Sequence, residues 1–260
     1  SYDAMRNYLI DNGFTIFVEN EEYLTIRARF PRKGTATVRP ERMPAVTADF
    51  VLARKEGSYS DGRRPDAVVP GTIMDDLARR DFTINALFFD LETSEVVDLV
   101  GGLNDLKLGT IRTVGNAKDR FEEDRLRILR AIRFSGRFGS DLDSDIILFL
   151  VNDSSLAGVS PERIRDEFLK GVRTAKSVPR FLSLLERFAL FKEIFPNLNV
   201  NTRFNIDDDE LVVLASLLQF NDLTKLPKVL NKLTFSKNEI KGIMFFIMTL
   251  EIPFLPKIVK

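Results

Sequence analysis

The pattern of apolar and polar positions changes near residue 100. Before that point, short apolar runs alternate with charged turns or turns that contain Gly or Pro, which predicts one short helix followed by strands. The helix is expected to end near Asn12-Gly13. Strands are expected at 14–17, 24–30, 35–38 and 48–54, and a closing hairpin or helix–strand pair at 84–90 and 96–99. The segment 58–70 is rich in Gly, Pro, Asp and Arg, and it is expected to be a loop.

From Arg120 onward the apolar residues recur at helical spacing, with Ser160 and Pro161 typical of a helix N-cap and first helical position. The predicted helices are 121–138, 145–151, 161–172, 178–194, 210–220, 226–233 and 238–250. An α+β front part followed by helices alone predicts an α+β fold. We divide the chain into a head at 1–98, a helical neck at 99–175 and a helical body at 176–260.

Composition narrows the chemistry. The 260 residues are 44% hydrophobic and 29% charged, which is ordinary for a globular protein with a real core. The formal net charge is +0, so any RNA contact must use local basic patches. Cys and His are both absent, which excludes disulfides, thiolate zinc sites and imidazole catalysis. The remaining groups are carboxylates, Lys, Tyr, Ser, Thr, or a hard metal held by oxygen atoms.

Membrane and export signals are not visible in the sequence. The chain start shows no charged leader followed by an apolar stretch, and the longest late apolar run, 243–250, is too short to span a bilayer. We therefore expect a cytoplasmic protein without a membrane partner, with an organelle matrix as the alternative. The oligomeric state is left open.

The segment 122–130 contains an acid followed by arginines at three-residue intervals: Asp124, Arg127, Arg130 and Arg133. On a helix that begins near Glu123, Asp124 and Arg127 are expected to project side by side. Arg127 is expected opposite the apolar face. Arg133 falls on that face and therefore needs a polar partner.

An Asp/Arg pair suits a nucleobase edge, because a carboxylate accepts hydrogen bonds and a guanidinium donates them. Cytosine and adenine each offer an amino donor beside a ring-nitrogen acceptor, whereas uracil and guanine offer the reverse order. Asp124 and Arg127 would thus select C and A, with Arg130 and Arg133 placed for phosphates or for orienting the pair. The alternative is an intrahelical ion pair on a solvated face.

A second charged segment, 75–86, meets an apolar run at Arg79-Arg80-Asp81. Here an arginine is expected to meet a triphosphate, while Asp81 or Asn85 meets a ribose hydroxyl or fixes that arginine. The alternative is a charged helix or strand end. Asp49, between alternating apolar neighbours, would suit a metal on a sheet or, alternatively, is an exposed strand acid.

These segments carry a family resemblance. Residues 75–86 resemble the DDLxRRDFTINA motif of class II tRNA nucleotidyltransferases (CCA-adding enzymes) and bacterial-type poly(A) polymerases. The stretches 101–106, 109–115 and 120–139 match the sequence that follows in the family, and Ser160-Pro161-Glu162-Arg163-Ile164 is similar to its neck helices. The resemblance covers roughly residues 1–200.

The resemblance implies an incomplete polymerase-β-like nucleotidyltransferase head, a mixed sheet with helices, followed by a helical neck and body. It also implies that Asp124 and Arg127 form the amino-acid template for incoming CTP or ATP, and that Arg80, Arg130 and Arg133 contribute to the pocket. The implied reaction transfers CMP or AMP to an RNA 3′ end with Mg²⁺, foremost CCA addition to tRNA. Poly(A) synthesis is not separated from it by these motifs.

The family also has a Gly-Gly/Ser…Arg-Asp loop that is followed by an Asp-x-Asp pair, which holds two magnesium ions, and this combined motif is not recognised in this sequence. Asp49 corresponds to a third acidic position, so it is a candidate catalytic residue, but it cannot hold two ions alone. We therefore expect either a companion chain or segment that carries the first head strands, or a non-catalytic RNA- or nucleotide-binding relative.

Overall fold

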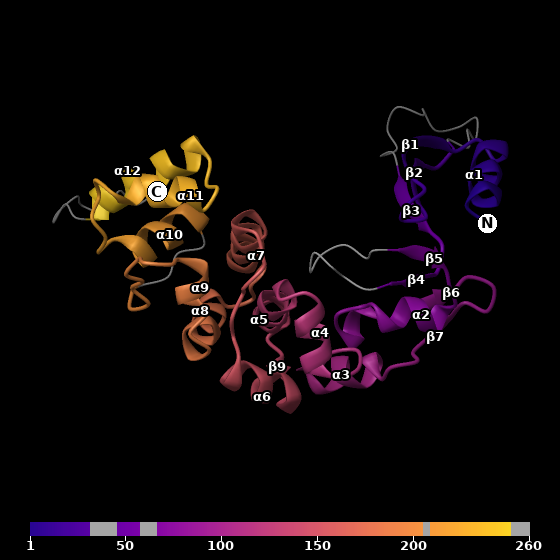
Figure 1. Ribbon diagram of the computed structural model, residues 1–260, viewed down its shortest axis with the longest axis horizontal. Helices are drawn as coiled ribbons and strands as arrows, with labels where there is room; N and C mark the ends of the chain where they lie inside the picture. Colours follow the sequence, from indigo (N-terminus) through magenta and orange to yellow (C-terminus); the bar gives the residue numbers. More distant parts are fainter. Residues whose placement is uncertain (32–45, 58–66, 205–208, 251–260) are drawn as a thin grey trace, which may run out of the picture. The chain divides into compact units, whose positions relative to one another are not determined.

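The structure, a computed structural model, describes residues 1–31, 46–57, 67–204 and 209–250. The chain separates into two compact units, Ser1–Arg80 and Asp81–Lys260 (Figure 1). The domain boundaries proposed above at residues 98 and 175 remain a prediction. Within the described ranges, no helix is long and apolar enough to cross a membrane.

The first unit begins with a helix that packs on a small antiparallel sheet. Helix α1 spans Tyr2–Asp11, and strands β1 (Thr15–Asn20), β2 (Thr25–Arg29) and β3 (Thr47–Val51) follow in that order across the sheet. Ile26 and Ala28 of the central strand are fully buried and meet Leu9 of α1 in one core. Buried and exposed residues therefore alternate along β2, so that one face of the strand lies against the core.

The rest of this unit is a two-stranded sheet and a short helix. Strands β4 (Arg54–Glu56) and β5 (Val68–Pro70) pair antiparallel, and α2 spans Ile73–Ala78 behind a capping box of Thr72 and Asp75. The strand predicted over 48–54 ends at Val51, with Arg54 already in β4. The loop predicted over 58–70 is wrong at its end, because two β-branched valines of β5 pair with β4. The strand predicted at 35–38 and residues 58–66 of the predicted loop lie outside the described residues.

The second unit opens with a short 3-10 turn at Thr83–Asn85 and a hairpin, as the sequence predicted for this region. Strands β8 and β9 pair in parallel. Apart from these strands and the hairpin, the elements described in this unit are helices. The elements are β6 (Phe88–Asp90), β7 (Glu95–Val97), α3 (Gly102–Leu108), β8 (Thr110–Ile111), α4 (Ala117–Glu123), α5 (Leu126–Phe138), β9 (Asp141–Leu142), α6 (Ser144–Asn152), α7 (Pro161–Thr174), α8 (Val178–Arg187), α9 (Phe191–Ile194), α10 (Glu210–Leu218), α11 (Leu226–Lys232) and α12 (Lys237–Leu250).

One hydrophobic core runs through the second unit from Phe82 to Ile247, and α5 packs against α7 and α8 within it (Figure 1). The close approach depends on Gly171 of α7, because a Cβ there would lie 2.1 Å from Cζ of Phe181 on α8. The aromatic ring thus fills the space that a side chain would need. The α+β fold class is confirmed.

Two predicted helices are each divided. The helix predicted over 178–194 becomes α8 and α9, because Ala189 adopts a left-handed φ of 54°. The helix predicted over 121–138 becomes α4 and α5, separated at Asp124-Arg125. The N-cap predicted at Ser160 is confirmed, with Pro161 in the first turn of α7. The break at Asp124 matters most, since it lies inside the candidate site.

Candidate nucleotide-binding site

Asp124 lies at the junction of α4 and α5. Its backbone is extended, with φ −149° and ψ 103°, and its Oδ1 accepts a hydrogen bond of 3.1 Å from the backbone N–H of Leu126. The carboxylate thus satisfies an N–H of the first turn of α5 that has no partner within the helix. The prediction that Asp124 and Arg127 share one helix as i and i+3 neighbours is therefore wrong.

Asp124 and Arg127 are each held by a different charged partner. Arg163 Nη2, in the first turn of α7, donates to Asp124 Oδ2 at 2.7 Å. Arg127 Nη1 donates to Glu123 Oε2 at 2.6 Å and to the carbonyl oxygen of Arg120 at 3.0 Å. Arg127 was expected opposite the apolar face of the helix, on its solvated side. Its side chain is instead buried, because the residue is only 9% exposed. The junction holds the carboxylate and the guanidinium in fixed positions by separate contacts.

Arg130, one turn further along α5, binds Asp81. Its Nε donates to Asp81 Oδ2 at 2.8 Å, and Asp81 Oδ1 accepts from Phe82 N at 2.8 Å and from Asn85 Nδ2 at 3.2 Å. Burial raises the pKa of Asp81, but the charge and hydrogen bonds of Arg130, with those of Asn85 and Phe82, outweigh it and lower the pKa overall. Asp81 therefore stays ionised. It holds an arginine, as expected, but this arginine is Arg130 of α5 and not Arg79 or Arg80.

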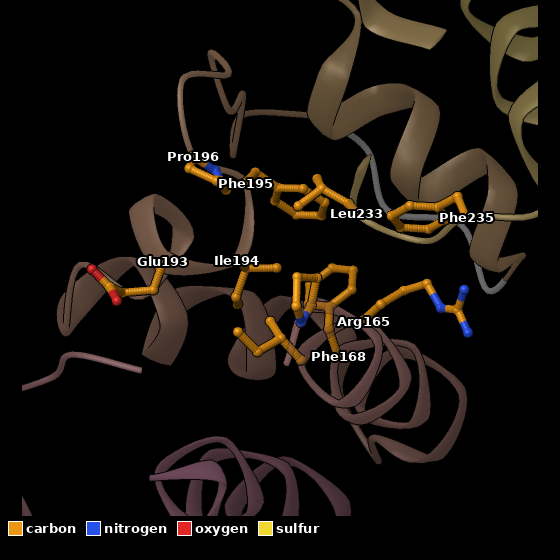
Figure 2. Close-up of a pocket in the computed structure, with 10 residues that line it drawn as sticks. Arg165, Phe168, Glu193, Ile194, Phe195, Pro196, Leu233 and Phe235 are labelled. Atoms are coloured by element: carbon orange, nitrogen blue, oxygen red, sulfur yellow. The ribbon is translucent and has the colours of Figure 1, made fainter. Parts of the chain in front are cut away.

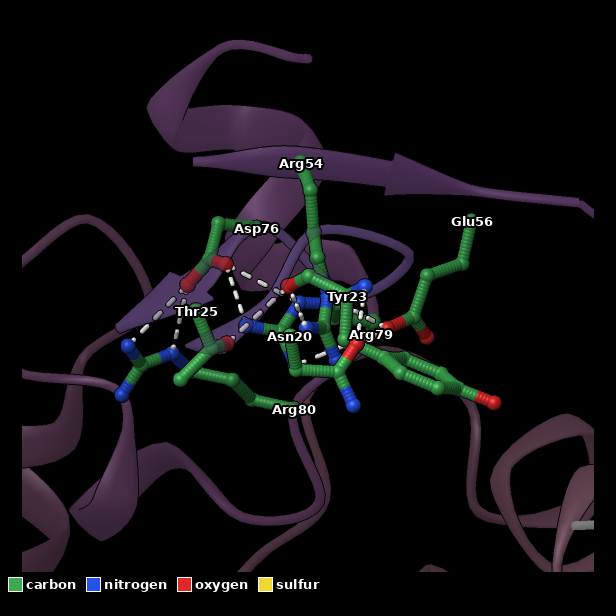
Figure 3. A network of polar contacts seen from close by, with 8 residues as sticks. All are labelled: Asn20, Tyr23, Thr25, Arg54, Glu56, Asp76, Arg79 and Arg80. Carbon is green, nitrogen blue, oxygen red and sulfur yellow. Dashed lines mark hydrogen bonds and ion pairs between the residues drawn. The ribbon is translucent and has the colours of Figure 1, made fainter. Parts of the chain in front are cut away.

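Arg80 belongs to the first unit and is held by Asp76 of α2, which is buried. Arg80 Nε and Nη2 donate to Asp76 Oδ2 at 3.1 and 3.0 Å, and Arg79 Nε donates to Oδ1 at 2.9 Å. Figure 3 shows this carboxylate between the two arginines, in a network that also contains Arg54 and Glu56. Asp76 was not among the expected site residues, although the spacing of four residues between this acid and Arg80 is a local signal for an ion pair.

Arg133 lies in the interface between α5 and α7. Its Nε donates to Oε1 of Glu167 on α7, and the two side chains are 9% and 3% exposed. The guanidinium carbon also lies 4.1 Å from the centre of the Phe134 ring. The expectation that Arg133 needs a polar partner on the apolar face is met by Glu167. Its role in the nucleotide pocket stays a prediction.

Asp49 lies on β3, opposite Arg27 of β2. Both of its oxygens accept hydrogen bonds from Arg27, at 2.5 Å from Nε and 2.8 Å from Nη2. The hydrogen bond from Arg27 lowers the pKa of Asp49. Among the residues that the structure describes, no three acidic side chains gather where they would hold a metal ion. These residues therefore do not fit the two-magnesium site that the family resemblance implies.

Two positioning residues were missed by the sequence analysis, Glu123 and Arg163. Glu123 precedes Arg127 by four residues, which is the spacing of a helical ion pair and was a usable signal. Arg163 follows Asp124 by 39 residues, and it was named only within the segment that is similar to the family's neck helices. Only the packing of α7 on α5 brings it to the junction.

A separate apolar pocket lies between α7, α9 and the turn from α11 to α12. Figure 2 shows its lining, which includes Phe168, Ile194, Phe195 and Phe235. Arg165, also in the lining, binds Asp166 at 2.7 Å. None of the residues that the sequence analysis named as site residues lines this pocket. It is therefore distinct from the candidate nucleotide site.

Two segments of the chain match models of known protein families. Residues 14–112 match a model described as "Poly A polymerase head domain", and residues 151–201 match one described as "Probable RNA and SrmB- binding site of polymerase A". The fold and the matched head define a nucleotidyltransferase-type protein. The chain belongs to the family of class II tRNA nucleotidyltransferases (CCA-adding enzymes) and bacterial-type poly(A) polymerases, as the resemblance of its motifs implied.

Individual relatives show the extent of the likeness. The CCA-adding enzyme of Leuconostoc mesenteroides is 48% identical over 124 residues, 47% of this chain and 31% of that protein. That of Lactobacillus helveticus is 36% identical over 207 residues, 75% of this chain and 51% of that protein. The chain thus spans about half or less of these relatives. The solved structure of Bacillus stearothermophilus CCA-adding enzyme in complex with CTP shares the fold, with 22% identity, a TM-score of 0.71, and coverage of 91% of this chain and 56% of that one.

Proposed function

We propose that this protein acts in template-independent addition of CMP and AMP, from CTP and ATP, to RNA 3′ ends, with CCA addition to tRNA as its reaction. The observation that carries the proposal is the junction of α4 and α5, where Asp124 and Arg127 are held by Arg163 and Glu123. The curated relatives are CCA-adding enzymes. Solved structures of the same fold are described with CTP, or with a primer tRNA and an ATP analogue.

Asp124 and Arg127 are the residues to which we assign base selection. A carboxylate has about four acceptor positions, and the bonds from Leu126 and Arg163 use two of them. The remaining positions suit the amino group of cytosine or adenine, while the Arg127 guanidinium donates to the adjacent ring nitrogen. Uracil and guanine present the reverse order of donor and acceptor, so they would meet unpaired groups.

Arg130 and Arg80 are the residues to which we assign phosphate contacts. A guanidinium carries five N–H donors, and Arg130 spends only those of Nε and Nη2 on Asp81. About a third of the Arg130 and Arg80 side chains is exposed, 33% and 31% respectively. Arginines held in this way present planar donors to an incoming anion with little further loss of entropy.

The metal-binding carboxylates are the part of the reaction that we do not assign to these residues. Asp49 is bound by Arg27, and the described residues do not gather further acids around it. We therefore assign nucleotide selection and RNA binding to this chain, and the metal carboxylates to a companion chain or segment.

The test uses tRNA that lacks its 3′ CCA, Mg²⁺ and each labelled nucleotide, singly and together. We expect incorporation of C followed by A, either by the chain alone or with its companion segment. Tailing with A alone would indicate a poly(A) polymerase. Binding of ATP or CTP without incorporation in either case would indicate a non-catalytic relative, and failure to bind either nucleotide would remove the proposal.

A further inference from the structure

The C-terminal end of α5 carries an exposed aromatic ring, Phe138, that is aligned with a buried ring. The rings of Phe134 and Phe138 are parallel, with an interplanar angle of 4° and centroids 5.9 Å apart. Phe134 is 7% exposed, whereas Phe138 is 44% exposed. The buried ring therefore fixes the orientation of the exposed one, which keeps much of its surface open to a further planar group.

One cation lies over this ring, and a second lies next to the residue that follows the ring in the chain. The Arg137 guanidinium carbon is 5.4 Å from the centre of the Phe138 ring. The aliphatic chain of Lys176 passes next to Gly139, with its Cδ 3.7 Å from where a Cβ would be. Within the described ranges, Arg137 and Lys176 form no ion pair, while the neighbouring acid Asp141 is bound by Arg180. The surface around Phe138 is thus positively charged.

The ring belongs to a line along α5 that starts at the candidate nucleotide site. Arg130, Phe134 and Phe138 follow one another at four-residue intervals, and the Arg130 guanidinium carbon lies 5.5 Å from the centre of the Phe134 ring. Eight residues of helix extend about 12 Å. That is the length of three to four stacked bases at about 3.4 Å each.

An exposed aromatic ring flanked by unpaired cations is the combination that binds single-stranded nucleic acid, by base stacking and phosphate contacts. Lys176 also lies within residues 151–201, whose family model is described as an RNA-binding site, and α7 and α8 of that segment pack on α5. These contacts therefore favour RNA over an apolar protein partner for this surface.

We propose that Phe138, Arg137 and Lys176 form a stacking platform for single-stranded RNA. The platform receives a base three to four nucleotides before the 3′ end when the terminal nucleotide lies at Arg130. The position of the 3′ end rests on the proposed function, whereas binding of single-stranded RNA at the platform does not. Arg137 and Lys176 contact the phosphates on either side of the stacked base.

The first test measures the affinity of the chain for a single-stranded RNA oligonucleotide that contains 2-aminopurine, whose fluorescence is quenched by stacking. Phe138→Ala is expected to weaken binding about 5- to 100-fold, and Phe138→Trp is expected to preserve it, because any aromatic face can stack. The matched control is Phe220→Ala, which removes another exposed ring, 69% exposed, and should leave the affinity unchanged. Equal affinity of Phe138→Ala and the unmodified chain would overturn the platform.

A second pair of variants covers the case in which Phe138→Ala unfolds α5. Arg137→Gln is expected to weaken binding and to reduce the salt dependence by about one phosphate contact. Arg187→Gln is its control, because Arg187 also lies over a phenylalanine, Phe188, but that ring is buried and offers no platform. Equal losses in the two arginine variants would overturn the proposal.

The register is tested by moving the 2-aminopurine along the oligonucleotide. The quench is expected to be largest three or four nucleotides from the 3′ end and to vanish there in Phe138→Ala. An even quench at every position would overturn the register. Binding of CTP and ATP, measured separately, should be unchanged in Phe138→Ala, so failure of the platform and failure of the proposed function give different results.

Discussion

Two acid–arginine pairs connect α7 to the region of α5, and they differ in depth. Arg163 and Glu167 lie four residues apart, on one face of α7. Arg163 binds Asp124 with both side chains 20% exposed, while Glu167 binds Arg133 with side chains 3% and 9% exposed. The buried pair joins α5 to α7, and the role of Arg133 in the nucleotide pocket stays a prediction. The partly exposed pair of Asp124 and Arg163 keeps acceptor positions for a base under the proposed function.

The pattern of charges along the chain therefore does not by itself separate a binding group from a structural one. Asp124 and Arg133 belong to the same family motif, and both meet an oppositely charged residue of α7. What separates them is whether the partner leaves part of the group in contact with solvent. Three variants test this separation, in order of decreasing expected effect, and a pH titration then tests the neighbouring pair of Asp81 and Arg130.

Glu167→Ala is expected to have the largest effect, because it leaves the Arg133 guanidinium buried without its charged partner. Removal of one member of a buried pair costs about 3–5 kcal/mol in the free energy of unfolding. Denaturant unfolding measures the loss. The control is Glu210→Ala, whose partner Arg173 is more than half exposed, and it should cost less than about 1 kcal/mol. Similar costs for the two variants would show that depth does not distinguish the pairs.

Asp124→Ala is expected to act on nucleotide choice more than on stability. Loss of one base-selecting group should reduce the preference for CTP and ATP over UTP and GTP by about 5- to 100-fold, with a lost helix cap costing about 1 kcal/mol. Competition binding with the four nucleotides measures the preference. Asp153→Ala is the control, since Asp153 binds the neighbouring Arg125 instead. An unchanged preference in Asp124→Ala would remove the selection role.

Ser160→Ala tests whether the position of Arg163 matters. Ser160 accepts from the backbone N–H of Arg163, so its loss should loosen the first turn of α7 and cost about 1 kcal/mol. Nucleotide preference should fall, but less than in Asp124→Ala. Ser177→Ala removes the equivalent cap of α8 and should cost similar stability with no change in preference. A shared loss of preference in both cap variants would contradict a specific role for Arg163.

Acidification should release Arg130. Since the pKa of Asp81 is lower in the folded protein than its ordinary value of 3.8, the pair stabilises the second unit above about pH 4. That contribution should be lost as the pH falls through the lower, folded pKa. The free energy of unfolding measured against pH should show this loss in the unmodified chain and less of it in Asp81→Asn. Parallel curves for the two proteins would contradict the assignment.

Much of the helical part could be predicted because its apolar residues recur at helical spacing and its caps are local. Ser160 and Pro161 begin α7 as expected, and Ile128 and Ile132 face the core. The break at Asp124 could not be predicted, since a side-chain bond to Leu126 competes with continuation of the helix. Strand β5 was missed because Gly and Pro nearby outweighed Val68 and Val69 in the sequence pattern.

The α+β class, most helices, the family motifs and the need of Arg133 for a polar partner could all be inferred from the order of residues along the chain. Tertiary structure decided which acid holds which arginine: Asp81 holds Arg130, Arg163 holds Asp124 and Glu167 holds Arg133. These partners are 34 to 49 residues apart along the chain. Local spacing cannot specify such contacts, because they depend on the distance and depth at which packed helices bring two side chains together.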